Sequence, residues 1–167
     1  IDGDATICYN NTADIVLASS QTGMSYQLKK QSDGTNVGSP VSGTGGMLIL
    51  NTGALTSSAV FIVVASNGSC SQQMTGQVSI LVQPQVVVQS VSTQQFCHQF
   101  GVDGIGFSAT PAGTNFTWTS TADFGAGLGG DGQIMGFTAV NNGSAALNAT
   151  VTVVGEYNGC YSSPVEF

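Results

Sequence analysis

The chain is poor in charge, and its few charges are mostly of one sign. Of its 167 residues only Lys29 and Lys30 are basic, and nine carboxylates bring the net charge to −7. Surfaces that bind nucleic acids or anionic membranes need clustered Lys and Arg. The sequence therefore predicts no nucleic-acid partner and no electrostatic membrane binding, and its diffuse acidity mainly supports solubility.

Long apolar runs are also missing. No segment approaches the roughly 20 residues that a membrane helix needs, so we expect no direct membrane insertion. The start, IDGDATICYN, lacks a Met and the basic and apolar regions of a signal peptide, as expected of a mature or excised fragment. Charged residues make up only 7% of the chain, against about 25% in typical soluble domains. The polar surface must therefore come from Ser, Thr, Asn, Gln and Gly, which is typical of secreted and cell-surface proteins.

Residue types that carry catalysis are scarce. His98 is the only histidine, beside Cys97 in QQFCHQFG, and no G-x-S-x-G nucleophile motif occurs. A disulfide-bonded cysteine has no thiolate to offer as a nucleophile. The glycine-rich TADFGAGLGGDGQ lacks the lysine and the following helix of a phosphate-binding P-loop. The sequence therefore predicts no catalytic residues and a protein that is not an enzyme. A hydrolase with two scattered carboxylates is the alternative.

Carboxylates that could hold a metal ion are few and dispersed. Calcium takes six to eight oxygen ligands, several of them from carboxylates. The best local candidates are Asp2 and Asp4 in IDGDA, and the competing interpretation is that they are ordinary turn aspartates. We therefore predict no metal and no cofactor, and keep Asp2 and Asp4 as weak calcium candidates.

The sequence is rich instead in short β-forming segments. Met24, Tyr26 and Leu28 alternate with polar residues, which is the period of a half-buried strand, and no window carries a helical stripe. Asn-Gly and Asp-Gly turn signals separate the segments. Further strands are expected at 13–18, 47–50, 60–65, 78–82, 86–88, 105–109, 116–118, 134–140 and 149–154. Short strands at this spacing predict an all-β fold of sandwiches with about seven strands each.

Two stretches of the chain nearly repeat each other ninety residues apart. VVASNGSC occupies residues 63–70 and VVGEYNGC occupies residues 153–160. The same alignment places Cys8 over Cys97, which indicates a tandem duplication. The aromatic strands align as well, and we expect their buried residues to anchor the two cores: Tyr26, Leu28, Phe116 and Trp118.

The boundary between the two repeats is expected near Pro84. This proline interrupts the β-rich run QVSILVQPQVVV, and proline is poorly tolerated inside a paired strand. The sequence therefore predicts one domain at 1–84 and a second at 85–167.

The four cysteines form two pairs with matched spacing. Zinc sites usually contain a close C-x₂₋₄-C pair, and the chain has none. One cysteine pair in each repeat favours two intradomain disulfides, Cys8–Cys70 and Cys97–Cys160, and hence an oxidising, extracellular compartment. Because Cys70 and Cys160 follow turn signals, we expect each bond to tie strand ends together at one pole, unlike the mid-strand bond of antibody domains.

The order of these motifs resembles a known family of repeats. A cysteine, an aromatic-x-Trp or aromatic-x-Leu strand, and a β-run into N-G-C resemble the Ig-like and PKD-like repeats of very large Bacteroidota surface adhesins, including type IX-secreted gliding-motility adhesins. The first repeat, with CYNNTADIVLASSQTGMSYQL, is similar to their Ig-like module. The second, with FTW and ATVTVVGEYNGC, is similar to their PKD-like module. It lacks the WDFGDG-type stretch of common PKD modules, so no role of that motif is carried over.

The resemblance implies a surface-anchored parent with many repeats. The expected function is a stalk, spacer and adhesion module in gliding motility or surface attachment, located outside the cell at its surface. The expected partners are neighbouring repeats of the same chain, surface polysaccharide and other cell-surface proteins. One alternative is a carbohydrate-binding module, which would need an exposed aromatic platform. Another is an extracellular filament subunit completed by a neighbour's strand, because few residues follow Cys160 and the last strand of 85–167 could be truncated.

Overall fold

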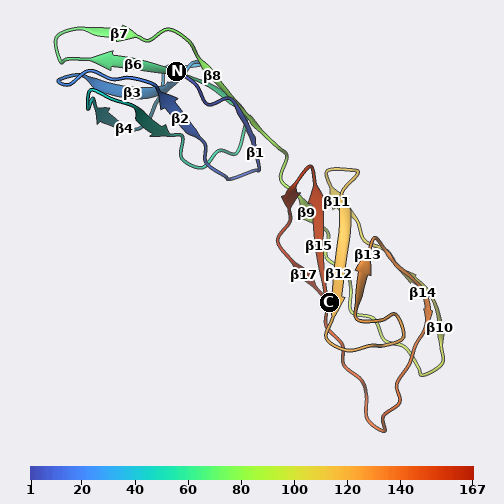
Figure 1. Cartoon of the computed structure of the whole chain (residues 1–167). Helices are drawn as coiled ribbons and strands as arrows, with labels where there is room; N and C mark the ends of the chain where they lie inside the picture. The colour runs from blue at the N-terminus through green and yellow to red at the C-terminus, as the bar shows by residue number, and fades with distance from the viewer. The chain divides into compact units, whose positions relative to one another are not determined.

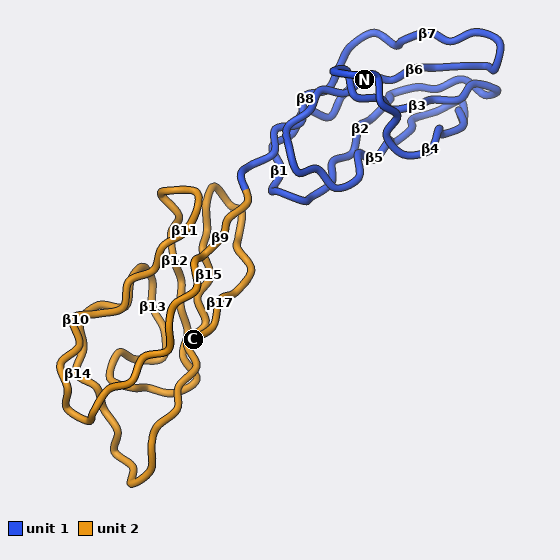
Figure 2. The backbone as a smooth tube through the Cα atoms, turned by 180° about the vertical axis from the view of Figure 1, so that it is seen from behind, with its two compact units in different colours: residues 1–84 blue, residues 85–167 orange.

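The chain folds into two compact units that divide after Pro84. A computed structural model describes all of residues 1–167, with unit 1 at Ile1–Pro84 and unit 2 at Gln85–Phe167 (Figure 2). Every regular element is a β-strand, which agrees with the all-β prediction. The structure contains no helix with the length and apolar character required to cross a bilayer.

Unit 1 is a sandwich of a large and a small sheet (Figure 1). The strands of the large sheet, in the order β1-β8-β6-β3-β4 with β7 also paired to β6, are β1 (Ala5–Ile7), β3 (Ser25–Lys30), β4 (Asn36–Ser42), β6 (Ala59–Ser66), β7 (Ser71–Gln73) and β8 (Val78–Val82). The small sheet pairs β2 (Asp14–Leu17) with β5 (Leu48–Asn51). Strand β1 is parallel to β8, and the other pairs are antiparallel.

The core of unit 1 lies between these two sheets. Ile15 and Leu17 of β2 are almost fully buried, as are Leu28, Phe61 and Val63 of the large sheet. Burial alternates along β2 and β5, so each strand turns one face to the core and one to solvent. Apolar burial of this kind is the main stabilising contribution to a small sandwich.

Unit 2 is built from shorter strands around a second core. Its strands are β9 (Val87–Val88), β10 (Gly101–Ile105), β11 (Ala109–Thr110), β12 (Asn115–Ser120), β13 (Gly129–Asp131), β14 (Ile134–Thr138), β15 (Val151–Tyr157), β16 (Cys160–Tyr161) and β17 (Val165–Glu166). The largest sheet has the order β13-β12-β15-β16 with β17 also paired to β15, and β10 pairs with β14 and β9 with β11. Its core contains Trp118, Ile134 and Val153, against which the half-buried Phe116 packs.

The two units share the order of the central strands of their large sheets, whereas the first strand pairs differently, β1 with β8 in unit 1 and β9 with β11 in unit 2. In unit 2, β12 pairs with β13 and β15, as β3 pairs with β4 and β6 in unit 1. The register also repeats: Leu28 lies opposite Val63, and Trp118 opposite Val153, at a distance of ninety residues along the chain. The small sheet of β2 and β5 corresponds to the pair of β10 and β14. The units are therefore two versions of one module.

The last strand of unit 2 is supplied by the chain itself. Val165 pairs with Val153 in β15, and Phe167 and Val151 exchange two backbone hydrogen bonds. This strand, β17, runs along β15 as β8 runs along β6 in unit 1. The few residues after Cys160 are therefore enough to form the last strand, and the reason for expecting a neighbouring molecule to supply it is removed.

Candidate functional site

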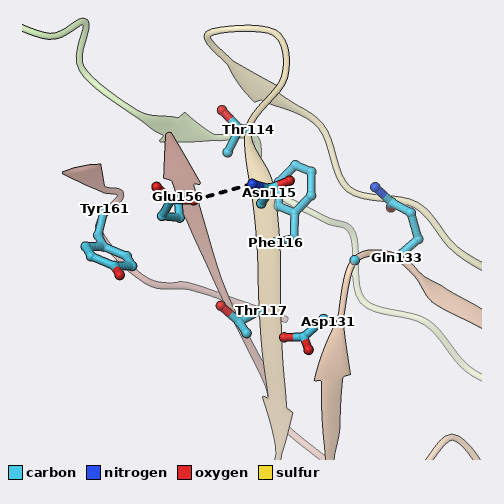
Figure 3. Close-up of a pocket in the computed structure, with 9 residues that line it drawn as sticks. Thr114, Asn115, Phe116, Thr117, Asp131, Gln133, Glu156 and Tyr161 are labelled. Atoms are coloured by element: carbon cyan, nitrogen blue, oxygen red, sulfur yellow. Dashed lines mark hydrogen bonds between the residues drawn. The ribbon is translucent and has the colours of Figure 1, made fainter. Parts of the chain in front are cut away.

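The exposed face of the large sheet in unit 2 carries a row of chemically distinct side chains. Asn115 of β12 lies opposite Glu156 of β15, and Glu156 lies opposite Tyr161 of β16. In the next row on the same face, Thr117 lies opposite Asp131 of β13 (Figure 3). We call these five residues the polar face.

The polar face lines an open depression of about 550 Å³. The carboxylate of Glu156 is oriented by two donors, the backbone N–H of Gly159 and the side-chain amide of Asn115, at 2.5 and 3.4 Å. Tyr161 lies beside it and is 70% exposed. An exposed aromatic ring next to carboxylate and amide groups offers an apolar surface together with hydrogen-bond donors and acceptors, which suits a polyhydroxylated ligand.

Unit 1 lacks this chemistry at the corresponding positions. There, Ser25 lies opposite Ser66, and Ser66 lies opposite Ser71. Three serines thus replace the amide, the acid and the aromatic ring. Periodicity does not mark these solvent-facing positions, although the two repeats differ there when they are compared position by position.

The cysteines do not pair as the spacing predicted. Cys8 and Cys160 are the disulfide-bonded cysteines, and Cys70 and Cys97 are free, exposed thiols. The predicted intradomain bonds Cys8–Cys70 and Cys97–Cys160 are therefore wrong, and so is the expectation that each repeat ties two strand ends together at one pole.

The geometry of unit 1 explains why its two cysteines cannot meet. We call the end of each unit next to the Pro84–Gln85 connection its linker pole and the opposite end its outer pole. Cys8 follows β1 and lies beside Gln83, whose N–H donates to Ile7, so it is at the linker pole. Cys70 is in the β6–β7 turn at the outer pole (Figure 1). The length of β6 separates them by about 25 Å, whereas a disulfide needs Cα atoms within roughly 7 Å.

Unit 2 separates its cysteines in the same way. Cys160 pairs with Tyr157 at the end of β15, and nearby Gly155 packs against Val88 of the first strand, so this end is the linker pole. The segment that follows Cys97 hydrogen-bonds to Ala139 at the other end of the unit. Six steps along β15 place the two cysteines roughly 20 Å apart.

The calcium candidates are engaged with the protein backbone. Asp2 accepts a hydrogen bond from the N–H of Gly3 at 2.7 Å, and Asp4 accepts one from the N–H of Ser79 at 2.6 Å. No group of three or more His, Cys, Asp or Glu side chains is arranged to hold a metal ion. Asp4 thus connects the N-terminal segment to β8.

His98 and the glycine-rich loop are likewise engaged in local structure. The Nδ1 atom of exposed His98 accepts a hydrogen bond from the N–H of Asn141 at 3.1 Å. Asp123 accepts hydrogen bonds from the N–H groups of Gly125 and Gly127, which hold the pKa of its carboxyl below the ordinary value of 3.8. Both residues thus stabilise loops of unit 2.

The fold and the repeated strand order define the chain as a pair of tandem Ig-like β-sandwich modules. The sequence model of the family described as "Domain of unknown function (DUF8696)" matches residues 1–84, the whole of unit 1. The chain belongs to this family. No curated protein sequence matches it.

Several solved multi-domain structures match the chain at low identity. Titin-A168169 has a TM-score of 0.43 and 16% identity, with 98% of this chain and 92% of that chain covered. The chicken CNTN1 FN1–FN3 domains have a TM-score of 0.36 and 11% identity, with 99% and 65% covered. The N-terminal four Ig domains of Dscam1 isoform 6.9 have a TM-score of 0.34 and 12% identity, with 98% and 42% covered.

Proposed function

We propose that the chain is a non-enzymatic part of a multi-repeat cell-surface adhesin and serves as stalk, spacer and adhesion module. The observation that carries this proposal is the repetition of the central strand order in two units with separate cores. A chain of such modules gains length by adding repeats, each of which folds around its own core. The weakly charged surface limits non-specific electrostatic association.

The resemblance to Bacteroidota repeats extends the proposal to a parent that is secreted by the type IX system and acts in gliding motility or surface attachment. Its partners would be neighbouring repeats, surface polysaccharide or other cell-surface proteins, and it would need no cofactor. The flanking sequence tests this extension. Further modules with a period of about ninety residues and a C-terminal sorting domain are expected, and a parent without either would contradict it.

Force spectroscopy tests the spacer role on the chain itself. Pulled from its ends in the presence of a reductant, the chain should unfold in two steps that each add roughly 25 nm of contour length, the extended length of about 84 residues less the folded size. A single step of twice that length would show one cooperative unit and would refute two independent spacers.

A second candidate function, binding of surface polysaccharide, is favoured by the polar face. The row of Asn115, Glu156 and Tyr161 occurs in unit 2 and is replaced by serines in unit 1. Such an asymmetry is not needed for a passive spacer. An exposed aromatic side chain such as Tyr161, a residue that is 70% exposed, is the platform that a sugar-binding site requires.

Matched variants test this second candidate. A glycan array probed with the intact chain should give ligands whose binding falls at least tenfold in Tyr161→Ser, which copies the residue of unit 1. Ser71→Ala, at the corresponding position of unit 1, should leave binding unchanged. An array without ligands for the folded chain, or equal losses in both variants, would remove the polysaccharide proposal.

A further inference from the structure

The polar face offers an exposed aromatic ring and hydrogen-bond acceptors, but no cation. Glu156 and Asp131 supply carboxylates, and Asn115 and Thr117 add an amide and a hydroxyl. Five of the chain's nine carboxylates lie in unit 2, whereas both lysines lie in unit 1 and arginine is absent. A ligand of the polar face therefore meets negative charge that no lysine or arginine of unit 2 neutralises.

The carboxylate of Glu156 is held in place and still has room for a ligand. The N–H of Gly159 donates to its Oε1 atom at 2.5 Å, and the amide of Asn115 donates to its Oε2 atom at 3.4 Å. An ionised carboxylate has about four lone-pair sites, so acceptor sites remain. Because the carboxylate is oriented before a ligand arrives, less ordering is required on binding.

Tyr161 gives the same place a second means of attracting a cation. It lies opposite Glu156 on β16 and is 70% exposed (Figure 3). The face of an aromatic ring attracts an ammonium group within about 6 Å of its centre. The ring also offers an apolar surface to the C–H groups of a sugar. An ammonium group on a sugar beside Glu156 would thus contact both the carboxylate and the ring.

Asp131 is a second carboxylate, at a distance that suits a polymer. In the sheet order β12 lies between β15 and β13, and the row of Asp131 is two residues along the strands from the row of Glu156. These steps place the Cα atoms of the two acids roughly 12 Å apart. A single ammonium group is too small to bridge them, whereas a chain that repeats the amine can pair with each.

We propose that the polar face binds a polysaccharide with protonated amino groups, of the class built from glucosamine units without N-acetyl groups. The inference rests on the proposed binding of surface polysaccharide and names its chemical class. Hydrogen bonds from an ammonium group to a carboxylate are about twice as strong as those between neutral groups, so the amino sugar binds more tightly than its acetylated form. Uronates and sulfated sugars would bring like charge to the face, which opposes their binding.

Three tetrasaccharides test this class in calorimetric titrations of the intact chain. They consist of glucosamine units, of the same units in N-acetylated form, and of galacturonate units, at a mildly acidic pH where the amines are protonated. The amino form should bind at least about tenfold more tightly than the acetylated form, and the galacturonate form should not bind. Affinity for the amino sugar should rise from the monosaccharide to the tetrasaccharide and fall with added salt.

Variants that remove one charge each locate the binding. Glu156→Gln keeps an acceptor for the N–H of Gly159 and should weaken binding of the amino tetrasaccharide about tenfold. Asp131→Asn should also weaken it and should abolish the increase with chain length. Asp103→Asn removes the same charge from an exposed position of β10, in another sheet of unit 2, and should leave the affinity unchanged. Melting followed by Trp118 fluorescence verifies that each variant is folded.

The possible contrary results separate this inference from the polysaccharide proposal. Equal or tighter binding of the acetylated or the galacturonate form would overturn the amine class and leave the polysaccharide proposal standing. Equal losses in Asp103→Asn and the two polar-face variants, or equally tight binding of a lysine tetramer, would show general attraction to an acidic unit and would also overturn it. Failure of all three tetrasaccharides to bind would refute the amine class, and a glycan array without ligands would remove both proposals.

Discussion

The separateness of the two cores leads to a quantitative prediction for a matched pair of substitutions. Val63 and Val153 occupy the same position in the two repeats, and both are fully buried, opposite Leu28 and Trp118 respectively. Replacement by Ala removes two methyl groups, worth about 1.6 kcal/mol of apolar transfer free energy. The residual cavity raises the expected loss to about 2–3 kcal/mol. For a domain of this size, such a loss of stability lowers the melting temperature by roughly 10–20 °C.

The single tryptophan makes the two units distinguishable in the assay. Trp118 is in the core of unit 2, so its fluorescence reports that unit, whereas far-UV circular dichroism reports both. Under reducing conditions Val153→Ala should lower the fluorescence-detected melting temperature. Val63→Ala should leave the fluorescence-detected melting temperature unchanged. It should lower the melting temperature of the part of the dichroism transition that belongs to unit 1. The exposed Val87→Ala is the control. Equal shifts of the fluorescence transition in both core variants would refute the assignment of two cores.

Three further predictions concern single groups. Tyr26→Phe removes the hydroxyl that accepts the Gln21 N–H at 2.8 Å, and should destabilise unit 1 by about 1–2 kcal/mol in urea denaturation without shifting the fluorescence transition. Gly130→Ala places a methyl group 3.2–3.3 Å from the Trp118 indole, and should lower the stability of unit 2 by about 1–3 kcal/mol and change its near-UV dichroism. The pKa of Asp123 is lowered in the folded chain, so its carboxylate stabilises the glycine-rich loop fully at a pH above the ordinary pKa of 3.8. This stabilisation is lost as the pH falls through the lower pKa that Asp123 has in the folded chain. NMR signals of the two bonded glycine amides should therefore titrate with a midpoint below 3.8.

Strong apolar alternation was enough to predict the central strands. The expected strand at 78–82 matches β8, and those at 24–28 and 116–118 fall on β3 and β12, where Tyr26, Leu28 and Trp118 are buried. These segments bury one face against a core, so their pattern is dictated by burial. The polar face could not be predicted from pattern, because solvent-facing positions of a sheet tolerate almost any residue.

The strands that were missed explain the wrong disulfide prediction. Strand β4 contains Gly38 and Pro40 and is largely exposed, so its sequence resembles a loop; an edge strand tolerates both residues. Its counterpart β13 is glycine-rich. When β4 and β13 are left out, four expected strands lie between the two cysteines of each repeat. Because consecutive strands run in opposite directions across the unit, an even number of strands would bring both cysteines to the same pole. With β4, the strands β2 to β6 cross unit 1 five times and place Cys8 and Cys70 at opposite poles.

The placement of the cysteines at opposite poles of each unit has a consequence for disulfide exchange. In the folded chain Cys70 cannot reach Cys8, and Cys97 cannot reach Cys160, because a disulfide needs Cα atoms within roughly 7 Å. Exchange of a bonded cysteine for the free cysteine of the same unit therefore requires that unit to unfold first. A rearranged bond, found by peptide mapping after stress, would identify the unit that had opened.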